Sequence, residues 1–254
     1  MTDVFDTETL GTSAAGALLG GVAGAMWGAP RLGAAVGAVH GWMAGRRRVY
    51  GQDRRGDRRG LVAFVLDHTW ALPTTIAGTV TMALSELRHR AGGADPGFLE
   101  SLSRRCDRFV FRRGLVLRRG FALTVGTVVT GAGGADGEIT ERREKLVTHH
   151  EDVHVWQARL LGPLYPLLYA AWFVGGAVVA VARRLTNRNT AAFSDVVDRY
   201  AYYRNPFEWH AYTCDDNWPP ASTDAHGVWK KEFPLREWIP SVLRESSGNR
   251  ATPR

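Results

Sequence analysis

The chain has 254 residues, a formal net charge of +7, 45% hydrophobic residues and 22% charged residues. It contains two cysteines, Cys106 and Cys214, and no C-x-x-C pair, which argues against a disulfide scaffold and a cysteine zinc site. The positive charge comes largely from arginine runs beside apolar segments, so we expect no nucleic-acid partner.

Residues 9–45 carry glycines at every fourth position. The first series is Gly16, Gly20, Gly24 and Gly28, and the second is Gly33, Gly37, Gly41 and Gly45. Small residues at this spacing let two helix backbones approach closely, and Pro30 between the series predicts the turn of a helical hairpin. The segment resembles the glycine-zipper membrane hairpins, which implies membrane lipid as a partner and homo-oligomers formed through these glycines. A loosely packed Gly/Ala-rich segment is the other interpretation.

A basic segment and a second apolar region follow. Residues 46–60 hold seven arginines against Asp53 and Asp57, which predicts a loop at 46–59 on the cytoplasmic side that contacts anionic lipid. Residues 61–90 are mostly apolar and predict either a third membrane segment or a pair of core helices. Asp67 and His68 interrupt this region, either as a functional pair or as an N-cap near a kink.

Short β-branched runs between 108 and 130, punctuated by Arg-Arg-Gly, predict two or three antiparallel strands, and the runs include 115–120. The glycine-rich segment 131–137 predicts a loop. An edge strand of this small sheet could hold an extended peptide.

The strongest chemical signal is His150-Glu151-Asp152-Val153-His154, an H-E-x-x-H sequence. A helix predicted from Thr140 to Leu161 places both histidines on one face, where both imidazoles can bind one zinc ion. Glu151 then lies where it can accept a proton from zinc-bound water. The alternative is a pair of core histidines bonded to carbonyl oxygens.

A third ligand is expected downstream. Asn205-Pro206 predicts the start of a helix, with Glu208 either as a capping residue or as a metal ligand on the facing side. Between the two helices, 165–182 is apolar enough to cross a membrane, but a crossing would separate Glu208 from the histidines. We therefore weigh a helical hairpin with 191–203 as the return arm, a dip into the bilayer, and a role for Glu208 other than ligand.

His150 and His154, with Gln157, Gly162-Pro163-Leu164-Tyr165 and then Asn205-Pro206-x-Glu208-x-x-Ala211, resemble the zincin-like metallopeptidases of the gluzincin type. The resemblance covers roughly 105–215 and implies a zinc ion held by His150, His154 and Glu208, with His210 and His226 as alternative third ligands. It implies Glu151 as the general base, and an oxyanion stabiliser is assigned to Tyr212, with Tyr203 or His210 as alternatives. Gln157 or Asp67 would orient a ligand histidine.

The sequence thus predicts a mainly helical α+β fold, with a small antiparallel sheet before the zinc helix and an N-terminal apolar hairpin. We expect a zincin-like domain at 100–240 and a disordered tail at 241–254. Four tryptophans, Trp209, Trp218, Trp229 and Trp238, predict either an aromatic cap over the Glu208 region or an interfacial belt. The expected function is a membrane-associated zinc metallopeptidase that acts on a peptide or protein. The alternative is a non-enzymatic glycine-zipper membrane protein, oligomeric or pore-forming, with a structural or vestigial metal site.

Overall fold

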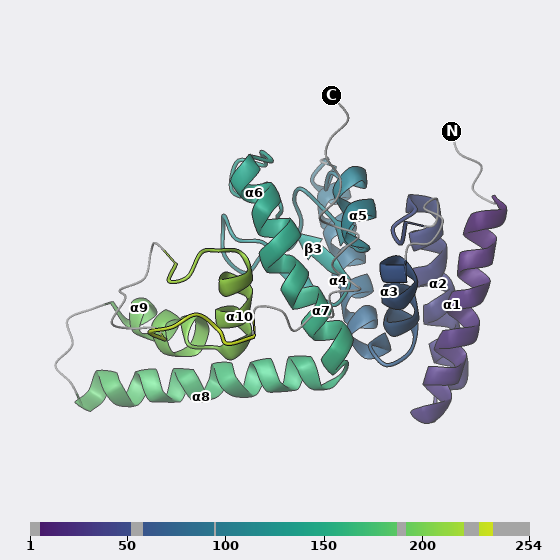
Figure 1. Ribbon diagram of the computed structural model, residues 1–254. Helices are drawn as coiled ribbons and strands as arrows, with labels where there is room; N and C mark the ends of the chain where they lie inside the picture. Colours follow the sequence, from purple (N-terminus) through teal and green to yellow (C-terminus); the bar gives the residue numbers. More distant parts are fainter. Residues whose placement is uncertain (1–5, 52–57, 94, 187–191, 221–228, 236–254) are drawn as a thin grey trace.

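The computed structural model describes residues 6–51, 58–93, 95–186, 192–220 and 229–235, and is mainly helical with one small sheet (Figure 1). The N-terminal helices are α1 (Thr7–Met26), α2 (Pro30–Arg47), α3 (Arg58–His68), α4 (Leu72–Ala91) and α5 (Glu100–Cys106). The strands are β1 (Phe109–Val110), β2 (Leu123–Val125) and β3 (Val128–Thr130). The remaining elements are α6 (Glu141–Lys145), η1 (Leu146–His150), α7 (Glu151–Leu161), α8 (Leu164–Thr186), α9 (Phe193–Val197), η2 (Asp198–Tyr203) and α10 (Pro206–Cys214).

The glycine repeats build a hairpin of α1 and α2, which confirms the predicted N-terminal helical pair (Figure 1). A Cβ atom added at Gly37 would lie 2.0 Å from the Gly16 carbonyl oxygen, and one at Gly20 would lie 2.3 Å from the Gly33 carbonyl oxygen. These glycines therefore pack against one another inside a single chain. Gly28 differs, because its φ of +72° places it in the turn before Pro30.

Of the two interpretations for 61–90, the structure has the helix pair α3 and α4, with Pro73 in the first turn of α4. Asp67 and His68 end α3 and are fully buried, so the N-cap interpretation is wrong. The expectation that the basic segment faces lipid is wrong for Arg59, which is 5% exposed and contacts Asp152 at 2.7 Å. Residues 52–57 lie outside the described residues.

The sheet is mixed, which corrects the expectation of an antiparallel one. Its strand order is β1-β3-β2, with β1 parallel to β3 and β2 antiparallel to β3. The run 115–120 is not a strand; it lies in the connection that carries the chain from β1 to β2 on the opposite side of β3. The buried faces of β1 and β3 contribute Phe109 and Val128 to a core that includes Trp156 of α7.

The predicted metal helix is one continuous rod of α6, η1 and α7. Thr140 caps its start by accepting from the Arg143 amide, and Gly162, with a φ of +53°, ends it. The middle segment is π-helical: the Glu151 amide donates to the Leu146 carbonyl, five residues back. Such segments often occur at functional sites, and the helical periodicity of the sequence does not reveal them.

Helix α8 lies crosswise to α1 and α2 along one edge of the molecule (Figure 1). The chain returns over it through α9 and η2, where the Cα of Gly176 approaches the backbone so closely that an added Cβ would lie 2.4 Å from the Tyr200 carbonyl oxygen. This packing matches the helical-hairpin interpretation of 165–182. It brings α10, which begins at the predicted Asn205 cap, back to α7.

Candidate metal centre

Three buried side chains from two helices converge between α7 and α10. His150 and His154 come from consecutive turns of one rod, and Glu208 comes from the first turn of α10; each is no more than 6% exposed. The Nε2 atoms of the two histidines are 3.2 Å apart. Glu208 Oε2 lies 3.4 Å from His150 Nε2, and Glu208 Oε1 lies 3.4 Å from His154 Nε2. Folding thus brings Glu208 into contact with the two histidines, although more than 50 residues separate them in the sequence.

These separations fit a tetrahedral zinc ion. Ligand atoms about 2.0–2.1 Å from a tetrahedral ion lie about 3.3 Å from each other. The three groups form a set that could hold a metal ion, with one atom from each residue within 4.8 Å of the others. Glu208 Oε2 is buried, and its 3.4 Å contact with His150 Nε2 is the polar contact that the described residues give it, which fits an oxygen suited to a cation.

The neighbouring side chains fix the orientation of the candidate ligands. His154 Nδ1 lies 2.9 Å from Gln157 Oε1, so in the neutral imidazole this contact favours the proton on Nδ1, which would leave the lone pair of Nε2 for a metal ion. Gln157 therefore occupies the orienting position expected of it. Tyr169 of α8 donates to Glu208 Oε1 at 2.7 Å, and the Tyr165 hydroxyl lies 3.3 Å from His154 Nδ1.

The electrostatics of the centre favour one added positive charge. Burial opposes the charged form of His154, but Glu208 outweighs it and raises the pKa of His154 to about 9. Burial likewise opposes the carboxylate of Glu208, but His154 and His150 hold its pKa well below its usual range. A protonated His154 beside Glu208 would balance these charges as a metal ion would. Metal content therefore distinguishes the two states.

Glu151 lies next to the ligand set and beside a cavity. The Thr124 hydroxyl of β2 donates to Glu151 Oε2 at 2.6 Å, which leaves Oε1 to accept a proton. A cavity of about 380 Å³ is lined by His150, Glu151 and Tyr212, and by residues 120–122 just before β2. β2 is an edge strand of the sheet, and the cavity is lined by the residues that lead directly into it.

The other predicted site residues have separate positions. Tyr212 packs edge-on against His150, with ring centroids 4.4 Å apart, and its hydroxyl lies 3.4 Å from that of Tyr202. His210 Nδ1 lies 3.3 Å from Gln157 Nε2 and is outside the three-residue set, and burial lowers its pKa to about 4. Tyr203 lines the cavity. His226 and Trp238 lie outside the described residues.

Sequence reasoning missed the residues that hold the far side of α7. Arg108 donates to Asp152 at 2.5 Å, and Arg159 donates to Asp67 at 2.8 and 3.0 Å. Asp67 therefore does not orient a histidine, which corrects one of the two candidates for that role. Sequence reasoning also assigned no role to Tyr165 or Tyr169, although their spacing of four within an apolar helix was a usable signal.

The aromatic cap is present in part. Trp209 stacks on Trp229 with ring centroids 5.1 Å apart and lies 6.2 Å from Trp218. Because Trp209 is adjacent to Glu208 on α10, this cluster covers the outer side of that helix. Comparison of the chain with known protein families, curated proteins and solved structures gives no match.

Proposed function

We propose that the chain is a membrane-associated, zinc-dependent metallopeptidase whose ion is held by His150, His154 and Glu208. The observation that carries this proposal is the geometry of those three residues, with Glu151 beside them on a cavity. A zinc ion bound there would supply a water of lowered pKa and polarise a substrate carbonyl. Among the described residues the set has three members, as in zinc sites that keep an open position.

The chain's own groups have distinct parts in this proposal. Glu151 accepts a proton at Oε1 and donates it to the leaving amine, while Thr124 holds Oε2 in place. Gln157 keeps His154 in the tautomer that presents Nε2 to the ion. Tyr212, buried beside His150, stabilises the developing oxyanion through its hydroxyl. The peptide lies extended along residues 120–122 and the β2 edge.

The test combines metal analysis with one conservative substitution. Purified wild type, His154→Ala and Glu208→Ala are analysed for zinc, and we expect about one ion per chain in wild type only. Glu151→Gln should keep the zinc and lose hydrolysis of a fluorogenic peptide library, whereas the exposed neighbour His149→Gln should keep both. Wild type without zinc, or full activity in Glu151→Gln, would refute the proposal.

A non-enzymatic membrane protein remains the second candidate, because the outer face of α1 exposes Leu18, Val22 and Met26 by 73%, 67% and 79%. The zipper glycines are already used inside the hairpin, so a homo-oligomer or pore would use this outer face. In that case Glu151→Gln would be silent, and deletion of 9–45 would abolish function. A cytoplasmic location of 46–59 is part of either proposal.

A further inference from the structure

Helix α8 presents one continuous apolar stripe to solvent. By length and composition, α8 and α1 are the described helices that could cross a membrane, yet only Ala180 of α8 is buried. Four residues at helical spacing on the outer face define the α8 stripe. They are Leu167, Val174, Val178 and Leu185, which are exposed by 66%, 61%, 63% and 81%. A stripe of this size needs a partner.

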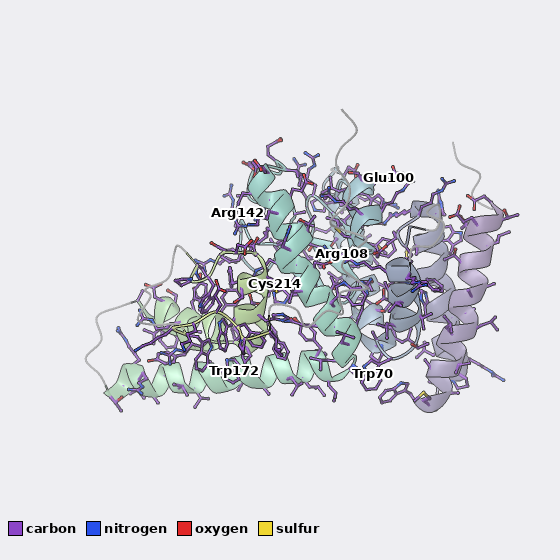
Figure 2. The ribbon with its side chains drawn as sticks, viewed as in Figure 1. Trp70, Glu100, Arg108, Arg142, Trp172 and Cys214 are labelled. Carbon is purple, nitrogen blue, oxygen red and sulfur yellow. The ribbon has the colours of Figure 1, made fainter. Side chains whose placement is uncertain are left out.

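Two other exposed apolar groups lie at the same edge of the molecule. The turn of the α1–α2 hairpin exposes Met26, Trp27 and Leu32 by 79%, 57% and 62%. Trp70 donates its indole N–H to the Leu160 carbonyl at 3.0 Å, which places it where α7 ends and α8 begins. Figure 2 shows Trp70 at this edge near the start of α8, and Figure 1 shows the hairpin turn reaching the same level. We call the α8 stripe, Trp70 and the hairpin turn the basal surface.

The segments that form the basal surface are nearly free of acidic residues and are bordered by arginines. No Asp or Glu occurs in residues 9–52, 68–85 or 152–194 other than Asp152, which lies on α7 against Arg59 and Arg108. Arg31 follows the hairpin turn, and Arg183 lies near the end of α8. An apolar, aromatic surface bordered by arginine complements a bilayer with anionic headgroups.

The inner side of α8 argues against a crossing of the bilayer. It contacts Glu208 through Tyr169, and η2 packs along its middle at Gly176. Asp198 of η2 accepts from Arg118 at 3.0 Å. If α8 crossed the bilayer, these charged groups would be carried to its depth, where ionised side chains are costly. In addition, α8 lies crosswise to α1, so a flat bilayer cannot have both along its normal (Figure 1).

We propose that the basal surface rests on an anionic lipid bilayer, with α8 lying in the plane of the interface and the hairpin turn dipping into it. The placement on the bilayer rests on the membrane association proposed above and is independent of the metal centre, whereas the substrate class rests on the proposed peptidase activity. Tyr165 and Tyr169 connect the inner side of α8 to His154 and Glu208, so the centre is held close to the lipid surface. The corresponding substrate class is protein segments adjacent to a bilayer.

Depth measurements on the full chain distinguish the two orientations of α8. Single cysteines at the four stripe positions, in a Cys214→Ser background where Cys106 is buried, would carry nitroxide labels. Collision accessibility to oxygen and to a water-soluble relaxer then gives depth in phosphatidylcholine–phosphatidylglycerol vesicles. We expect all four positions at one shallow depth, about 5–10 Å. A depth that passes through a maximum near Val174 would show a spanning helix and overturn the proposal.

Vesicle flotation tests the lipid itself. The pair Leu167→Glu and Val174→Glu should weaken binding to these vesicles about tenfold or more, and vesicles of phosphatidylcholine alone should bind wild type less. The matched control is Leu87→Glu, an equally exposed leucine (66%) in the last turns of α4, which should bind as wild type does. Equal binding by the stripe variant, or water-accessible labels and no flotation of wild type, would overturn the proposal. Zinc content measured in the same samples separates this failure from failure of the metal centre.

Discussion

Removal of one hydroxyl, in Tyr169→Phe, should weaken zinc binding without disturbing the fold. The Tyr169 hydroxyl donates to Glu208 Oε1 at 2.7 Å, and its ring stacks on Phe207 with centroids 6.0 Å apart. Phenylalanine keeps that stacking and loses only the hydrogen bond. Hydrogen bonds to charged groups contribute about 1.5–3 kcal/mol, which corresponds to about 10- to 100-fold in affinity. Loss of a group that orients a metal ligand is expected to cost a similar factor.

The assay is competition for zinc between the full-length protein and a fluorescent chelator at neutral pH. The matched control is Tyr165→Phe, four residues earlier on α8. Its hydroxyl is 3.3 Å from His154 Nδ1, a nitrogen already paired with Gln157 at 2.9 Å, so we expect a change of about threefold or less. An unchanged zinc affinity in Tyr169→Phe, or an equal loss in both variants, would refute the reasoning. Circular dichroism verifies that both variants are folded.

Two further predictions concern stability. Gly37→Ala should lower the free energy of unfolding by about 3 kcal/mol, because its Cβ would lie 2.0 Å from the Gly16 carbonyl oxygen. Gly11→Ala, whose Cβ would have nothing within 4 Å, should raise the free energy of unfolding by about 0.5–1 kcal/mol. Thermal unfolding measures both changes. Burial lowers the pKa of His40 and His68 below 6.5, so the folded state binds fewer protons than the unfolded state. Stability of chelator-treated protein should therefore fall as the pH drops below about 6.5, and a flat denaturation midpoint between pH 7 and 5 would contradict this.

Local signals in the sequence predicted the elements that carry the site. Thr140 and Asn205 each cap the helix that they were expected to begin, because a side-chain oxygen there accepts an otherwise unpaired amide. The four-residue spacing of His150 and His154 needs nothing beyond helix geometry to place both rings together. These parts of the site could be predicted from the sequence because each signal acts within one helical turn.

The remaining features depend on distant contacts. The parallel pairing of β1 with β3 depends on a crossover whose path no local turn residue specifies. The ion pairs of Arg59 and Arg108 with Asp152 join residues 93 and 44 positions apart. Helical periodicity predicts that a charged residue faces solvent. It contains no information about an oppositely charged residue on another element that would pair with it. Helical periodicity therefore gave no sign that Asp152 and Arg159 lie in ion pairs with residues of other elements.

The charges on the two sides of α7 argue for a cation at the centre. On the far side, Asp67, Asp107 and Asp152 are matched by Arg59, Arg108 and Arg159, and all six are mostly or fully buried, so that cluster carries no net charge. On the near side, the buried acids are Glu151 and Glu208, and the two histidines beside them are neutral unless protonated. A proton on His154 would balance Glu208, while Arg143, which lines the same cavity as Glu151, interacts electrostatically with that carboxylate. Since burial of an unbalanced charge is costly, a metal ion between the two neutral histidines would compensate Glu208 as the arginines compensate the aspartates on the far side.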